Sequence, residues 1–123
     1  MRLCWSTIYV KNMGESLKFY SEFIGLNIHH RQTQPDVDMV YLGEDGQAYL
    51  ELIEDKAVEK VNLAGSYSIG LQVENGQDIV DKLKAEGYTL LGGPIKPNVI
   101  TKFWVVQDPD GLKVQLVEIN DDL

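Results

Sequence analysis

The sequence predicts an α+β fold built from two tandem copies of one strand-helix-strand-strand-strand module. An internal repeat is the first sign: Asn12, at the end of a short apolar run, returns as Asn75, 63 residues later. The run Tyr49–Glu54 returns as Lys113–Glu118, with an offset of 64 residues. A duplicated unit of this size indicates two similar modules that pack together. We therefore expect a single domain with modules over about residues 1–60 and 61–123.

The first module reads as a strand, a helix and three further strands. Residues 4–10 are rich in apolar and β-branched residues, which favours a strand. Asn12 is a candidate helix cap with Glu15 three positions on, and apolar residues then recur at helical spacing as far as Gly25, which can end the helix. The remaining strands are expected over residues 26–31, 38–42 and 48–53.

The second module repeats this order. A strand is expected over residues 67–73, a cap at Asn75 and a helix that stops at Gly87. Shorter strands should follow over residues 89–91, 102–107 and 112–118. The turn before the last of them, Asp108–Gly111, has proline and glycine at the positions that a type I turn favours.

Composition and charge exclude several function classes. With 123 residues, 44% of them hydrophobic, the chain is typical of one soluble domain. The net charge of −8 would repel a nucleic acid backbone, and the longest apolar runs are far shorter than a membrane span. A single cysteine, Cys4, and no recognisable signal peptide favour a cytoplasmic location.

Strand alternation divides the side chains between two faces. Trp5, Thr7 and Tyr9 share one face of the first strand, while Cys4 and Ile8 share the other, which should meet the helix. The same parity puts further candidates on the helix-free face: Tyr49, Glu51, Ile53, Ser68, Gly70, Gln72, Lys113, Gln115 and Val117. That face should be a mixture of aromatic, amide and hydroxyl groups with one carboxylate.

The chain resembles the vicinal oxygen chelate superfamily, which holds glyoxalase I, bleomycin-resistance proteins and extradiol dioxygenases. The resemblance rests on the order of elements, on the helix start from Asn12 to Tyr20, and on Asp108–Gly111 before the last strand. The stretch Leu91–Lys96 looks most like the glyoxalase I branch. It implies a cupped mixed sheet around a cavity, with a divalent metal held by one residue from the first and last strand of each module.

Carried over by position, the four metal sites fall on Trp5, Glu51, Ser68 and Gln115. An indole nitrogen has no lone pair to give, and serine and glutamine are weak neutral ligands. Glu51 alone remains both a ligand and a base. We therefore expect no metal and no other cofactor. Tyr9 stands where the family has an arginine that helps to bind glutathione, which weakens the case for a lactoylglutathione lyase.

Three functions stay open. The first is a metal-independent protein that binds or sequesters a small molecule: Trp5, Tyr9 and Tyr49 would hold a ring, and polar groups would orient it. The second is a divergent lyase or isomerase that uses Glu51 as its catalytic base, with or without nickel, zinc, cobalt or manganese. The third is an interaction module whose cavity is plugged by Trp5. The proposed orienting groups are Glu51, Ser68, Gln72 and Gln115.

Two further expectations concern loops and assembly. Lys96 follows glycines and could close over an anionic ligand, the alternative being a solvated loop lysine. His29 and His30 are adjacent, so on a regular strand they should point to opposite faces and could not share an ion. Duplicated modules also favour a twofold homodimer. Whether the modules pair within one chain or across the dimer stays open.

Overall fold

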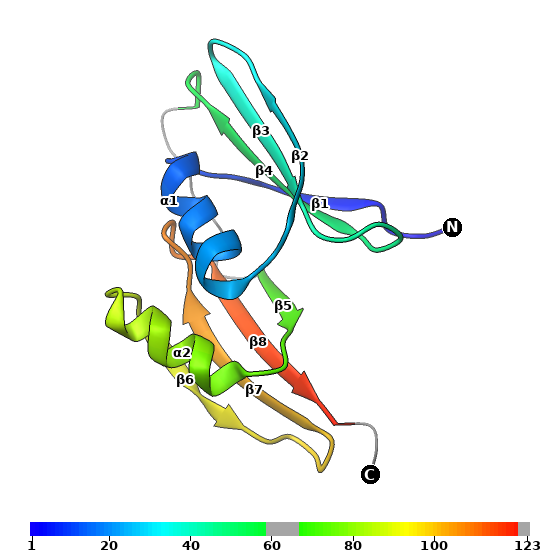
Figure 1. Ribbon diagram of the computed structural model, residues 1–123, viewed down its shortest axis with the longest axis vertical. Coiled ribbons are helices and arrows are strands. Elements are labelled where there is room, and N and C mark those ends of the chain that lie inside the picture. Colours follow the sequence, from blue (N-terminus) through cyan, green and yellow to red (C-terminus); the bar gives the residue numbers. More distant parts are fainter. Residues whose placement is uncertain (59–66, 121–123) are drawn as a thin grey trace. The chain divides into compact units, whose positions relative to one another are not determined.

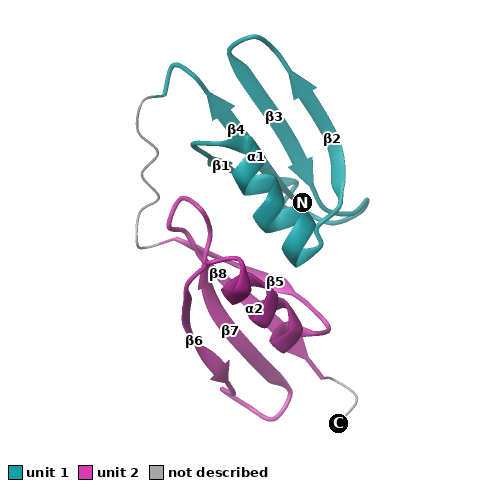
Figure 2. Cartoon of the chain, turned by 60° about the vertical axis from the view of Figure 1, so that its left-hand side comes forward, with its two compact units in different colours: residues 1–62 teal, residues 63–123 magenta. Residues whose placement is uncertain are grey.

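The computed structural model describes residues 1–58 and 67–120 of the chain. The chain divides into two compact units, Met1–Asn62 and Leu63–Leu123 (Figure 2). Each unit carries one copy of the predicted module. No helix in the described residues is both long and apolar enough to cross a membrane.

Unit 1 is a four-stranded mixed sheet with one helical segment. Its elements are β1 (Trp5–Tyr9), α1 (Met13–Leu17), the π-helical η1 (Lys18–Ile24), β2 (Ile28–Thr33), β3 (Val37–Leu42) and β4 (Tyr49–Asp55). The strands lie in the order β1-β4-β3-β2, with β1 parallel to β4 and the other pairs antiparallel (Figure 1).

Unit 2 repeats this topology. It contains β5 (Ser68–Gln72), α2 (Gly76–Ala85), β6 (Leu90–Ile95), β7 (Thr101–Gln107) and β8 (Lys113–Ile119), with strand order β5-β8-β7-β6. Again the first strand runs parallel to the last, and the other pairs are antiparallel. The predicted α+β class and the duplicated strand-helix-strand-strand-strand order are confirmed.

Each sheet buries one face, as alternation predicts. In β1, Ile8 is buried while Trp5 and Tyr9 are exposed, and in β8, Val114 and Leu116 are buried while Gln115 is only partly covered. The buried faces meet the helices, since α1 contacts β4, and α2 contacts β7 and β8. The opposite face of each sheet is therefore the one that carries the candidate site residues.

Both helices begin against a glutamate from the last strand of their own sheet. The Met13 N–H donates to Glu54 Oε1 at 2.6 Å, and the Gly76 N–H donates to Glu118 Oε2 at 2.7 Å. The Asn12 cap is confirmed, because its side chain accepts from the Glu15 N–H at 3.0 Å. Asn75 is the N-cap residue of α2, as expected, but its side chain makes no capping bond, and Glu118 accepts from the first helical N–H instead.

Two local expectations are also corrected. The strand expected over residues 89–91 runs on to Ile95, through a Gly-Gly-Pro segment that reads as a loop. Gly93 has φ +112°, and a Cβ there would lie 2.7 Å from Trp104 Cα, so a glycine is needed for this approach to β7. Cys4, assigned to the helix-facing side, is exposed because β1 begins only at Trp5.

Candidate ligand-binding site

Glu51 lies at the centre of the candidate site in unit 1. It is on β4, opposite Thr7 of β1 and Tyr41 of β3, and is only 7% exposed. The Thr7 hydroxyl donates to Glu51 Oε1 at 2.5 Å. The Tyr41 hydroxyl also donates to Glu51, and this bond, followed by desolvation, raises the pKa of Tyr41. Three neighbouring strands thus hold one carboxylate between two neutral hydroxyls.

A row of aromatic side chains runs beside this carboxylate. The aromatic row consists of Trp5, Tyr41, Tyr49 and His29, from four strands or their ends. Trp5 and Tyr49 each meet Tyr41 nearly edge-on, with ring centroids 6.1 Å apart in both pairs. Trp5 remains 52% exposed, so within unit 1 it is not a core side chain. The row offers flat apolar surface that solvent or a ligand can reach.

The far end of the aromatic row is fixed by polar contacts. His29 lies over Tyr49 with centroids 4.5 Å apart, and His29 Nε2 is 2.7 Å from Asp45 Oδ1. The Tyr49 hydroxyl donates to the same Asp45 oxygen at 3.1 Å. The hydrogen bond from His29 lowers the pKa of Asp45, while desolvation and then the bond to Asp45 raise the pKa of Tyr49. These contacts orient the Tyr49 ring.

The two histidines do not point to opposite faces. His30 lies beside Tyr41, with centroids 6.4 Å apart, and His29 lies on Tyr49, so both imidazoles meet the same group of tyrosines. The reason is an irregularity in the β2–β3 ladder between Ile28 and His30, which breaks strict alternation. The expectation from a regular strand is therefore wrong here.

The residues predicted from sequence divide between the two units. Trp5, Tyr9, Tyr49 and Glu51 lie on the helix-free face of unit 1. In unit 2, Ser68 and Gln72 are exposed on β5, and Gln115 is partly covered on β8. Gly70 is the residue opposite Gln115, and Ser68 is opposite Lys113. Unit 2 thus has the predicted amide and hydroxyl groups on the corresponding face, without a carboxylate beside Gln115.

Lys96 lies elsewhere in unit 2. It follows β6 and lines a cavity together with Lys102 of β7 and Glu118 of β8. Lys102 and Glu118 share the strand parity of the buried Trp104 and Leu116, which is the helix-facing side of the sheet. Lys96 therefore belongs to a different surface from the face that carries Gln115.

Two site residues were missed from the sequence. Thr7 was placed on the correct face without a role, and Tyr41 was not singled out. Their function depends on which residue of β4 lies opposite each, and this register is a property of strand pairing rather than of either strand's pattern. One sequence signal could have pointed to Tyr41. It alternates with the buried Val40 and lies on the same face of the strand as Met39, which is the face that carries the site.

In unit 1, the two residues at expected metal positions offer few ligands for a divalent ion. Trp5 has only an N–H to offer, and the groups bonded to the Glu51 carboxylate are the neutral hydroxyls of Thr7 and Tyr41. Across the described parts of the chain, no three His, Cys, Asp or Glu side chains gather closely enough to hold a metal. Hard and borderline cations bind tightly where several charged or imidazole ligands converge.

Comparison with known proteins places the chain in a family. Residues 2–116 match the profile of the Glyoxalase/Bleomycin resistance protein/Dioxygenase superfamily. The chain belongs to this superfamily. One relative within it is a lactoylglutathione lyase of Escherichia coli O157:H7, 30% identical over 129 residues that cover 98% of this chain and 95% of the relative.

Solved structures of the superfamily share the fold. The glyoxalase I of Leishmania major, described as trypanothione-dependent, has a TM-score of 0.78 at 23% identity. The match covers 99% of this chain and 88% of the Leishmania chain. An antibiotic-binding protein from a Streptomyces species has a TM-score of 0.70 at 17% identity, and the match covers 98% of this chain and 97% of that protein. At these identities the likeness establishes the fold alone.

Proposed function

We propose that this chain binds an organic small molecule on the helix-free face of unit 1 and that it does so without a metal. The observation that carries the proposal is the Glu51 carboxylate, held by Thr7 and Tyr41 directly beside an accessible aromatic row. A flat ring can stack on Trp5, and a hydrogen-bond donor on that ring can reach the carboxylate.

The chemistry of the site indicates the kind of ligand. Thr7 occupies Oε1 of Glu51, yet each carboxylate oxygen can accept more than one hydrogen bond, so the group can still receive an N–H or O–H from a ligand. The chain's net charge of −8 would repel an anion from this face. A planar heteroaromatic compound with N–H donors is therefore the favoured ligand class.

A structural neighbour supports the proposal of small-molecule binding. One solved structure with this fold is an antibiotic-binding protein. The polar residues on the corresponding face of unit 2, Ser68, Gln72 and Gln115, stay predicted ligand contacts. A twofold homodimer is part of the proposal, because duplicated modules offer the same surface for pairing within a chain or between chains.

The proposal is tested by following Trp5 fluorescence during titration with 2-aminobenzimidazole, a planar ring with N–H donors. The chain has two tryptophans, and Trp104 is buried, so a ligand on this face should change the Trp5 signal. Glu51→Gln should weaken binding about tenfold through loss of a charge-assisted hydrogen bond. Tyr41→Phe should weaken it less, because Thr7 still holds the carboxylate.

Matched controls separate a site effect from a general one. Glu22→Gln removes one charge from an exposed position in η1, and Tyr67→Phe removes an exposed tyrosine hydroxyl outside the site; both should bind as the unaltered protein does. Equal affinity in Glu51→Gln and Glu22→Gln would overturn the assignment of Glu51. The absence of any saturable Trp5 response would overturn the proposed face.

A second candidate function is a lyase or isomerase in which Glu51 is the proton-transferring base. The observation that favours it is the 30% identity, over nearly the full length of both chains, to a lactoylglutathione lyase. Glu51 would move a proton between adjacent carbons of a hemithioacetal. Turnover of such a substrate that disappears in Glu51→Gln, with or without added nickel, zinc, cobalt or manganese, would establish this function over simple binding.

A further inference from the structure

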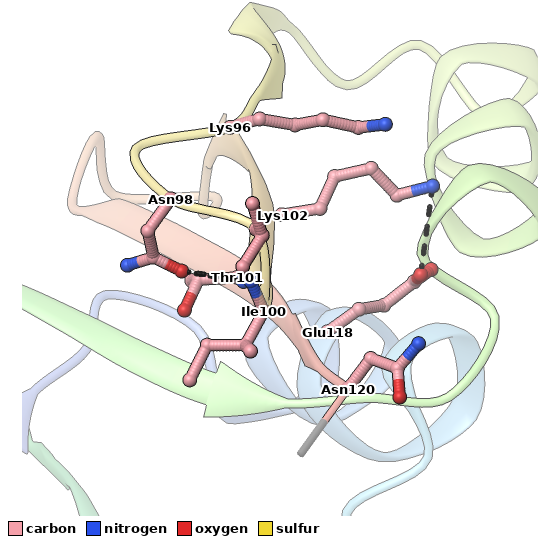
Figure 3. A pocket seen from close by; sticks show the side chains of 8 residues that line it. Lys96, Asn98, Ile100, Thr101, Lys102, Glu118 and Asn120 are labelled. Atoms are coloured by element: carbon pink, nitrogen blue, oxygen red, sulfur yellow. Dashed lines mark hydrogen bonds and ion pairs between the residues drawn. The ribbon is translucent and has the colours of Figure 1, made fainter. Parts of the chain in front are cut away.

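The cavity that Lys96 lines lies in unit 2, at the end of the sheet where β6 is joined to β7. Its volume is about 580 Å³. Figure 3 shows the cavity from close by, with the side chains of Lys96 and Lys102 extending in the same direction and Lys102 reaching Glu118. The remaining walls come from the connecting loop and the end of β8. The lining residues are Lys96, Asn98, Val99, Ile100, Thr101, Lys102, Glu118 and Asn120.

This cavity is separate from the proposed ligand-binding face. The Lys102 ammonium lies 5.4 Å from the centroid of Trp104, whose ring packs so closely on the start of α2 that a Cβ at Gly76 would come within 2.1 Å of it. Glu118 accepts a hydrogen bond from the Gly76 N–H. The cavity therefore opens on the helix-facing side of the sheet, beyond the start of α2.

The charges in the cavity are unequal. Glu118 uses Oε2 to accept from Gly76, and Oε1 lies 3.7 Å from the Lys102 ammonium, so its negative charge is already matched. Lys96 makes no ion pair within the described residues. Among the described lining residues, two ammonium groups thus face one committed carboxylate, which gives this lining a local positive charge in a chain whose net charge is −8. Such a reversal favours a small anion.

The loop that closes the cavity is held in shape by its own hydrogen bonds. Asn98 Oδ1 accepts from the N–H groups of Ile100 and Thr101 at 3.0 and 2.9 Å, and the Asn120 N–H donates to the Ile100 carbonyl at 2.7 Å. Because its oxygen is occupied, Asn98 can present only N–H donors to a ligand. Asn98 therefore adds donors rather than acceptors to the wall.

The duplicated module provides an internal comparison. The corresponding end of unit 1 has a cavity of about 190 Å³, lined by Thr33, Gln34, Pro35, Asp36, Val37, Asp38, Glu54 and Lys56. Glu54 there matches Glu118, since each meets the first N–H of the helix in its unit. The unit 1 cavity is smaller, and its lining has one lysine and three carboxylates, of which Asp38 is paired with Arg31. Of these two cavities, the one in unit 2 combines the larger volume with an excess of lysine over carboxylate among its described lining residues.

We propose that the unit 2 cavity is a binding site for a small anion, a carboxylate or a phosphate, held by Lys96 and Lys102. Lysine ammonium groups bind such oxygens as point charges, and the side-chain N–H groups of Asn98 can add hydrogen bonds. When the anion binds, Lys102 is shared between the anion and Glu118, so the start of α2 should sense its arrival through the Gly76 N–H.

The experiment is an NMR titration of the full chain, with amide shifts followed during addition of inorganic phosphate in one arm and succinate in the other, at constant ionic strength. We expect saturable shifts at Ile100, Thr101, Asn120 and Gly76. Saturation by phosphate alone or by succinate alone would identify which anion the site prefers. Because exposed charges are screened, the affinity should fall as salt is raised.

Variants decide whether the lysines carry the binding. Lys96→Gln and Lys102→Gln should each lower the affinity for the anion by at least about fivefold, because each removes a charged donor. Lys96→Gln keeps the Lys102–Glu118 contact, so this variant still tests the proposal if Lys102→Gln does not fold. Lys56→Gln in the unit 1 cavity removes the same charge and should leave binding unchanged. Shifts that fail to saturate, or an equal loss in Lys56→Gln, would overturn the proposal.

Discussion

At the scale of single residues, the hydroxyls of Thr7 and Tyr41 define what Glu51 can do. A carboxylate that accepts from two hydroxyls is fixed in orientation, which suits recognition of a ligand's N–H or O–H. Trp5 is the complementary element, since an indole in a metal-ligand position cannot bind the ion but can stack on a ring. The same pair of residues thus argues against a metal and for an organic ligand.

The Tyr41 contact gives a pH-dependent prediction. The hydrogen bond to Glu51 raises the pKa of Tyr41, so the neutral phenol is the form that the folded state favours. Its contribution to stability should be complete below the ordinary phenol pKa of about 10 and lost as pH rises through the raised value. In Glu51→Gln, the pKa of Tyr41 should fall toward the ordinary one.

Ultraviolet difference titration measures this shift, with Tyr41 identified by the transition that Tyr41→Phe removes. Glu22→Gln is the control and should not change the pH of the Tyr41 transition, because Glu22 lies outside the site. A Tyr41 transition at the same pH in Glu51→Gln and in the unaltered protein would show that the two groups do not interact.

At the scale of secondary structure, the helices begin against the last strand of their own sheet. Glu54 and Glu118 lie at equivalent places in the repeat, and each accepts the first helical N–H. A negative charge at that end also interacts favourably with the positive end of the helix dipole. The repeat therefore preserves a tertiary contact between strand and helix, while only the first copy keeps a capping asparagine as well.

This difference predicts unequal effects of two equivalent substitutions. Asn12→Ala should lower the free energy of unfolding by about 1 kcal/mol, because it removes the bond to the Glu15 N–H. Asn75→Ala should have an effect near zero, since the Asn75 side chain caps nothing. Urea denaturation of the two variants compares them directly. Equal losses would mean that Asn75 caps α2 in solution.

The same elements show what sequence patterns can and cannot predict. Alternation and the repeat were enough to place Ile8 inside and Glu51 on the opposite face, because successive side chains of a strand point to opposite faces. They did not predict that Glu51 is itself buried, as its neighbours Leu50 and Leu52 are. They were not enough for Tyr41 or for the Glu118 contact, which depend on pairing between distant segments. The orientation of His29 failed for a third reason, a local irregularity in the strand ladder.

At the scale of the whole chain, the two modules have kept one fold and diverged in chemistry. The row Thr7, Glu51 and Tyr41 in unit 1 corresponds by register to Gly70, Gln115 and Val105 in unit 2. The hydroxyl-carboxylate-hydroxyl arrangement therefore exists in one copy only. Unit 2 instead carries the lysine-lined cavity on its other face. Duplication thus supplied two scaffolds that present different groups.

The central claim is that the Glu51 site takes an organic ligand in place of a metal. Native mass spectrometry of the untagged chain, before and after incubation with nickel, zinc, cobalt and manganese, tests this most directly. The account predicts a dimer that acquires no stoichiometric metal and that gains the mass of 2-aminobenzimidazole when the compound is added. One metal ion per chain, retained on dilution and lost in Glu51→Gln, would contradict it.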